Sequence, residues 1–273
     1  MGEREVIAST AKGPITEKQL TSDLEKLGLK PGSVVIVHTS LSRIGWVCGG
    51  AVAVIHALQS AVRSYGAIVM PAHSGGLSDP ALWEDPPVPE EWWEPIRETM
   101  PAFDPDVTPT RGIGVIAELF RTMPDVVRSN HPQVSFAGWG EQAVSLLSNH
   151  SLENSLGEDS PLARLYDADA FVLLLGAGFE SNTSFHLAEY RSDYPTKERV
   201  TLNAPVIVDG HRRWKSFGDI NYATDDFVEI GRAFVKSHKQ AVRIGRIGQA
   251  VSHLFPQRLC VDYAGRWMRT HRR

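Results

Sequence analysis

The sequence has few cysteines, no long hydrophobic run and no excess of positive charge. Its two cysteines, Cys48 and Cys260, lie far apart without CxxC spacing, which excludes a disulfide framework and a cysteine-rich zinc module. The longest apolar stretch, residues 171–179, has about half the length that a bilayer crossing requires. The net charge of -4 disfavours nucleic acid as a partner. No secretory signal is visible, so we expect a cytoplasmic protein that binds neither membranes nor nucleic acid.

Short apolar runs predict a sheet that helices cover on both faces. Residues 33–38 and 171–175 lack the polar alternation of half-exposed strands, which is typical of parallel strands buried between helices. Residues 52–62 carry apolar side chains at helical spacing, and another strand is predicted at 67–70. Residues 33–71 are therefore a candidate βαβ unit.

Start and stop signals predict further helices. Thr16 has capping-box spacing to Gln19, and Gly28 offers a left-handed stop. Ser160 precedes Pro161, which is the order of a capping residue and a proline in the first helical position. Two more helices are predicted at 113–121 and 141–147.

The pattern changes toward the C-terminal end of the chain. Residues 206–208 and 213–217 flank an Asp-Gly pair and predict a hairpin. We therefore predict one α/β domain over residues 1–273. It has a central, largely parallel or mixed sheet flanked by helices, and an antiparallel and helical part at 199–273.

Residues 79–109 interrupt this pattern with a lid-like insertion. The segment holds eight of the 17 prolines, three tryptophans and nine acids against the single base Arg97. Acids beside aromatic faces attract a polycationic, sugar-like ligand. The candidate substrate contacts are His73, Asp79, Glu84, Asp104 and Asp106. The alternative is a proline-stiffened loop whose acids are simply solvated.

His186 and Glu189 form the clearest catalytic candidate. Their spacing of three places both side chains on one face of a helix. A carboxylate that holds one imidazole nitrogen leaves the other free to accept a proton from a nucleophile. The alternatives are a surface pair without function and metal ligation. His38, His73 and His131 are available as further ligands, but no HExxH or other zinc pattern occurs.

The turn after the first predicted strand is a candidate cofactor site. Hydroxyls and glycines lead there into a helix, where backbone amides favour phosphate groups. The residues in question are His38, Thr39, Ser40, Leu41, Ser42, Gly49 and Gly50. The alternative is an ordinary βα connection. A second glycine-containing turn at 175–181 resembles a dinucleotide fingerprint, but Ser181 fills its third glycine position and no P-loop motif occurs, so we reject nicotinamide and P-loop sites.

Nearly the whole chain resembles the aminoglycoside 3-N-acetyltransferase family, which comprises antibiotic N-acetyltransferases. The resemblance rests on several segments and above all on the sequence around His186 and Glu189. The matching segments are 38–51, 105–121, 131–137, 160–163 and 182–189. The Trp-rich stretch around 83–93 resembles the Bacillus-type branch.

This resemblance implies a reaction and a set of roles. Acetyl-CoA is the co-substrate, and the acceptor is the 3-amino group of a 2-deoxystreptamine aminoglycoside. His186 is the base, Glu189 orients it, residues 39–42 contact the pantetheine and phosphates, and Thr183 lies near the thioester. No metal is expected. Because attack is direct, no acetyl-enzyme forms on Cys48.

Other functions stay open on the sequence alone. They are a metal-dependent hydrolase, an acetyltransferase acting on another amine, and a non-catalytic binder of cationic sugars. The oligomeric state is also open, with a homodimer among the candidates.

Overall fold

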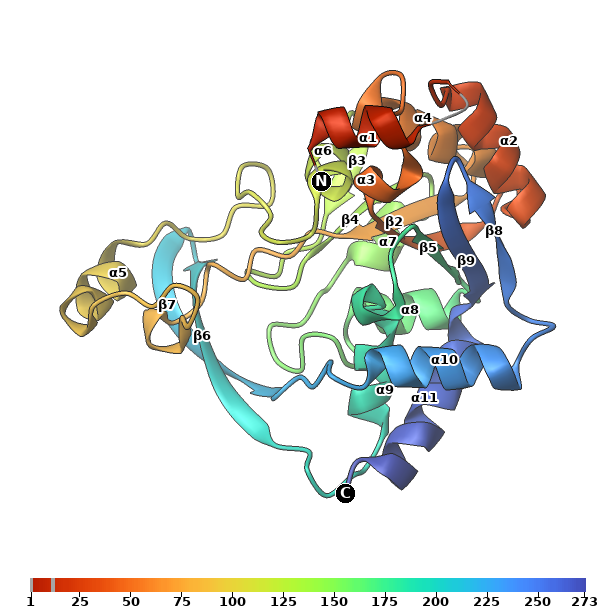
Figure 1. Ribbon diagram of the computed structural model, residues 1–273. Helices are drawn as coiled ribbons and strands as arrows, with labels where there is room; N and C mark the ends of the chain where they lie inside the picture. The colour runs from red at the N-terminus through yellow and green to blue at the C-terminus, as the bar shows by residue number, and fades with distance from the viewer. Residues whose placement is uncertain (1, 11–12) are drawn as a thin grey trace.

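A seven-stranded mixed sheet forms the centre of the molecule (Figure 1). The computed structural model describes residues 2–10 and 13–273. The strand order is β3-β4-β2-β1-β5-β9-β8, in which β1 runs parallel to β2 and β5 while the outer strands are antiparallel to their neighbours. The strands of this sheet are β1 (Val34–Thr39), β2 (Ala67–Pro71), β3 (Val126–Arg128), β4 (Phe136–Trp139), β5 (Phe171–Leu175), β8 (Arg243–Ile247) and β9 (Ala250–Pro256).

Helices connect and cover these strands. The helices are α1 (Glu3–Ser9), α2 (Glu17–Leu27), α3 (Leu41–Ile44), α4 (Gly50–Val62), α5 (Trp93–Thr99), α6 (Val115–Phe120), α7 (Ala143–Leu147), α8 (Pro161–Asp167), α9 (Ser184–Arg191), α10 (Phe227–Ser237) and α11 (Gln257–His271). Three short 3-10 turns are η1 (Pro80–Leu82), η2 (Glu90–Trp92) and η3 (Phe179–Ser181). The predicted α/β class with a helix-flanked mixed sheet is therefore confirmed.

The two faces of the sheet carry separate hydrophobic clusters. Because side chains alternate along a strand, Val35 and Val37 point to one face and Ile36 to the other. Helices α2, α4 and α6 pack on the first face, and helices α7 to α11 pack on the second. Burial on both sides explains why residues 33–38 are apolar without alternation.

The helix caps predicted from the sequence are present in the structure. Thr16 accepts a hydrogen bond from the Gln19 amide, and α2 stops at Gly28, which has φ of 107°. Ser160 caps α8 by accepting from the Leu162 amide. The helices predicted at 113–121 and 141–147 are shorter in the structure, where they become α6 and α7.

The insertion packs against a separate two-stranded ribbon that projects away from the central sheet (Figure 1). The ribbon consists of β6 (Arg199–Val208) and β7 (His211–Ile220), and its strands are longer than the predicted segments 206–208 and 213–217. Most of its side chains are partly or fully exposed, so it lacks the apolar alternation from which a half-buried strand is recognised. The Phe103 amide donates to Pro205, and Arg212 donates to the Met100 carbonyl.

Candidate active site

A cleft of about 770 Å³ opens where the three parallel strands end. The register places Thr39 of β1 beside Leu175 of β5, so these strands end at the same level. The chain leaves β1 over one face of the sheet through α4 to reach β2, whereas β5 follows α8 on the opposite face. Ligands of α/β proteins bind at such a switch point, beyond the carboxyl ends of the strands.

The turn after β1 forms one wall of this cleft. His38, Thr39, Ser40, Leu41 and Ser42 all line it, as the sequence led us to expect of a cofactor site, and Arg43 joins them. Gly49 and Gly50 do not line it. Gly49 instead precedes α4 with φ of 86°, where a glycine relieves backbone strain.

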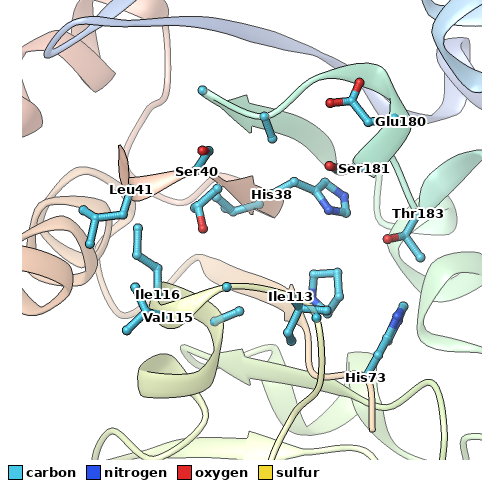
Figure 2. A pocket seen from close by; sticks show the side chains of 18 of the residues that line it. His38, Ser40, Leu41, His73, Ile113, Val115, Ile116, Glu180, Ser181 and Thr183 are labelled. Atoms are coloured by element: carbon cyan, nitrogen blue, oxygen red, sulfur yellow. The ribbon is translucent and has the colours of Figure 1, made fainter. Parts of the chain in front are cut away.

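The opposite wall comes from a segment that the sequence reasoning did not assign to the site. Residues 112–117, which run from a loop into the first turns of α6, line the cleft across from Leu41 (Figure 2). Gly112 and Gly114 both have positive φ. Two glycines flanking one apolar residue were the available signal of a tight backbone approach.

His186 of the predicted catalytic pair lines the cleft, whereas Glu189 does not. Nδ1 of His186 is 2.5 Å from Oε2 of Glu189, and the two residues lie one turn apart on α9. The Glu189 side chain has no exposed surface, whereas His186 is 12% exposed and lines the cleft. The ring of His186 lies between Tyr222 and Phe227, each about 5.0 Å away between centroids. The ring is thus held in place, and Nδ1 is committed to the carboxylate.

Two further histidines line the same cleft in the neutral form. Burial is the main cause that lowers the pKa of His38 and of His73 to about 3, and the charge of His186 lowers both further. Nε2 of each ring is buried and has no hydrogen-bond partner in the part of the chain that the structure describes. Neutral imidazoles next to His186 do not compete with it for protons at neutral pH.

The turn before α9 completes the cleft (Figure 2). Glu180, Ser181 and Thr183 line it, and Thr183 also accepts a backbone hydrogen bond from the His186 amide. Thr183 was predicted from the resemblance, whereas Glu180 and Ser181 were not. Ser181 is the residue that breaks the dinucleotide fingerprint, and its hydroxyl-bearing side chain instead faces this cleft.

The acids proposed from the insertion lie apart from this cleft. Asp79 is nearly buried and forms an ion pair with Arg97, with 2.7 Å between Oδ1 and Nη2. Glu84 is exposed and does not line the cleft. Asp104 and Asp106 line a separate hollow against Arg212 on the ribbon. Of the predicted substrate contacts, the structure brings His73 alone into the cleft with His186.

Neither cysteine is placed as a nucleophile. Cys48 is exposed and does not line the cleft, and burial raises the pKa of the Cys260 thiol. Within residues 2–10 and 13–273, no three His, Cys, Asp or Glu side chains gather as a metal site would require. No helix in the same ranges is both long and apolar enough to span a bilayer. The cleft therefore offers an oriented imidazole as its reactive group.

A switch-point cleft with an imidazole held by a buried carboxylate is typical of an enzyme active site. The model of the family described as aminoglycoside 3-N-acetyltransferase matches residues 36–269. The chain belongs to this family, as the resemblance around His186 and Glu189 indicated.

Relatives match nearly the full chain. The SPbeta prophage-derived aminoglycoside N(3')-acetyltransferase-like protein YokD of Bacillus subtilis strain 168 is 49% identical over 97% of this chain and 96% of its own. Its crystal structure matches with a TM-score of 0.95 over 98% of each chain. Aminoglycoside N(3)-acetyltransferase VII of Streptomyces paromomycinus is 37% identical over 94% of this chain and 92% of its own. A structure of AAC-IIIb described as binary with CoASH is 30% identical, with a TM-score of 0.85 over 94% of this chain and 97% of its own.

Proposed function

We propose that the protein transfers an acetyl group from acetyl-CoA to the 3-amino group of a 2-deoxystreptamine aminoglycoside. His186 acts as the general base, Glu189 holds and polarises it, and the amine attacks directly. The observation that carries this proposal is the 2.5 Å contact of a fully buried Glu189 with Nδ1 of His186, which lines the cleft at the strand ends.

A base is needed because an ammonium group has no free electron pair. For an amine with a lysine-like pKa, only one molecule in about 10³ is neutral at pH 7. With Nδ1 held by Glu189, Nε2 of His186 is the nitrogen that accepts the proton as the new N–C bond forms. Glu189 then lies beside the imidazolium and stabilises its charge.

The wall formed by the β1 turn suits the co-substrate. Ser40 and Ser42 offer hydroxyls, Arg43 offers a cation for phosphate groups, and residues 112–117 offer backbone amides and apolar contacts. Bound acetyl-CoA supplies the thioester carbonyl that the amine attacks. The C–S bond then breaks, and coenzyme A leaves as a thiol after the sulfur takes a proton. The relative AAC-IIIb, described as binary with CoASH, supports this assignment.

The acceptor assignment is supported by enzyme VII, which is named for the N(3) position of aminoglycosides. In this proposal Glu84, Asp104 and Asp106 attract the cationic sugar from the molecular surface rather than contact it beside His186. Asp79 holds the insertion together through Arg97. The single domain over residues 1–273 works in the cytoplasm; the homodimer stays a prediction.

The test measures coenzyme A release with a thiol reagent across a panel of aminoglycosides and simple amines. We expect wild-type turnover with aminoglycosides, a loss of about 10² to 10⁴ in kcat/KM for His186→Ala, and a loss of roughly 10² or more for Glu189→Gln. The exposed Cys48, changed to serine, is the matched control and keeps activity.

Three results would contradict the proposal. They are full activity of His186→Ala, loss of activity in Cys48→Ser, and turnover of simple amines in preference to every aminoglycoside in the panel. The last result would assign the protein to acetyl transfer onto another amine.

A further inference from the structure

The buried carboxylate of Glu189 is shared between two sets of partners. Its Oε2 holds Nδ1 of His186 at 2.5 Å. Its Oε1 accepts from Nη1 of Arg272 at 2.6 Å and from the Ala223 amide at 3.0 Å. A carboxylate with no exposed surface depends on such partners, because burial of a lone charge costs several kcal/mol.

Hydrogen bonds hold the guanidinium of Arg272 in place. Its guanidinium has five N–H donors, and five hydrogen bonds use them. Two reach both oxygens of Asp226 at 2.7 Å, one reaches the Ala223 carbonyl at 2.7 Å, one reaches the Tyr194 hydroxyl at 3.1 Å, and one reaches Glu189. The side chain is 7% exposed. Burial opposes its charge, but Asp226 and Glu189 together outweigh burial and raise its pKa.

The packing of α11 against α9 places the Arg272 side chain next to the pair of His186 and Glu189, here called the dyad. Helix α11 ends at His271 and lies against α9, which carries His186 and Glu189 (Figure 1). The Ser192 hydroxyl after α9 donates to the Gly265 carbonyl of α11 at 3.1 Å. Arg272 follows immediately and turns back toward Glu189, 83 residues away in the chain.

Arg272 supplies a positive charge beside the buried carboxylate of Glu189. When His186 is neutral, the fully buried Glu189 is paired with Arg272, and Arg272 is in turn paired with Asp226 at the start of α10. The ionisable groups that face the dyad from the surrounding elements are His38, His73, Tyr194, Lys197, Tyr222, Asp226 and Arg272. Of these, Arg272 is the cation in direct contact with Glu189.

We propose that Arg272 is a positioning residue of the active site, which keeps Glu189 ionised and turned toward His186. This inference rests on the proposed function. Arg272 touches no substrate; it acts through Glu189. Its positive charge lies 2.6 Å from Oε1 of Glu189 and so acts directly on the His186–Glu189 pair.

The test compares Arg272→Gln and Arg272→Lys with the matched control Arg269→Gln, which changes an exposed arginine on the same helix. The measurement is kcat and KM for acetyl-CoA and for one aminoglycoside from pH 5.5 to 9. Since every variant uses the same amine, differences between their profiles come from the enzyme.

For Arg272→Gln we expect a kcat reduced about 10- to 100-fold, with KM for acetyl-CoA changed less than about twofold. The acidic limb of its kcat/KM profile should move to higher pH by about one unit, because a cation near the dyad is lost. Arg272→Lys keeps the charge but only three donors, so its limb should stay in place while kcat falls a few-fold. Arg269→Gln should behave as wild type.

The proposal is overturned if folded Arg272→Gln shows the wild-type kcat and acidic limb. If Arg272→Gln fails to fold, Arg272→Lys provides the test. The inference is contradicted if the acidic limb of the kcat/KM profile of Arg272→Lys moves despite the retained charge, or if this variant shows the wild-type kcat. Failure of the proposed function is distinguishable, because wild type and Glu189→Gln would then be equally inactive with aminoglycosides.

Discussion

Mild acid should destabilise this protein through histidines that fold in the neutral form. His131 is fully buried; its Nδ1 accepts the amides of Gln133 and Val134, and its Nε2 donates to the Leu152 carbonyl. A second proton on Nδ1 would break both amide contacts. Burial is the main cause that lowers the pKa of His131 to about 4.

His150 is fixed in the same tautomer. Its Nε2 donates to the Ser155 carbonyl at 2.6 Å, and its Nδ1 accepts from the Ser129 hydroxyl, which in turn accepts the Phe136 amide. Burial holds the pKa of His150 well below its usual value. With the pKa values of His38 and His73 at about 3, these four imidazoles stay neutral in the folded state.

The sign and the size of this pH dependence of stability follow from proton linkage. Each of these four histidines has a folded pKa below its unfolded value of 6.5, so the unfolded chain takes up more protons as the pH falls below about 6.5. The contribution of these histidines to the free energy of unfolding is complete above that pH. It is lost as the pH falls toward their pKa values in the folded state. Between pH 7.5 and 5.5 each histidine costs about 1.3 kcal/mol, or about 5 kcal/mol for four. That is a large part of a typical unfolding free energy of about 5–15 kcal/mol.

Urea unfolding followed by tryptophan fluorescence at pH 7.5, 6.5 and 5.5 measures this loss. The matched variant His131→Gln retains a donor and an acceptor but no titratable ring, so its pH slope should fall by about one quarter. An unfolding free energy that is constant between pH 7.5 and 5.5 would refute the reasoning. If His131→Gln shows the same slope of unfolding free energy against pH as wild type, His131 does not contribute to the loss.

Three other perturbations test separate parts of the structure. Ser160→Ala removes the cap of α8 and should cost about 1 kcal/mol in urea unfolding; a change below about 0.3 kcal/mol would contradict the role of the cap. Phe185→Ala empties a fully buried position on α9 and should cost about 3–5 kcal/mol, measured in the same way, with a value near zero counting against tight packing there. Raising the salt concentration should increase KM for the aminoglycoside, because it screens the exposed acids of residues 79–109, and an unchanged KM from low to high ionic strength would exclude their role in attracting it.

Several features could be predicted from the sequence because they depend on neighbours along the chain. The apolar runs at 33–38 and 171–175 predicted strands buried on both faces, since hydrophobic pattern and burial are directly related. The spacing of His186 and Glu189 predicted their contact, since residues three apart in a helix share a face.

Other features were decided by contacts between distant segments. Nothing local indicated that residues 112–117 would face the β1 turn, or that Asp79 would pair with Arg97 instead of lining the cleft. The insertion joins the β6–β7 ribbon rather than the cleft, so its acids lie elsewhere than composition suggested.

Arg272 illustrates the difference most clearly. In the sequence it is one of several arginines near the end of the chain, and no local pattern links it to Glu189. Only the packing of α11 against α9 brings it to Glu189, where the cost of burying a carboxylate makes a cation necessary. The sequence thus determined the strands, the capped helices and the dyad through short-range patterns. The tertiary structure decided which distant charges surround that dyad, because burial and electrostatic interaction depend on distance in space and not along the chain.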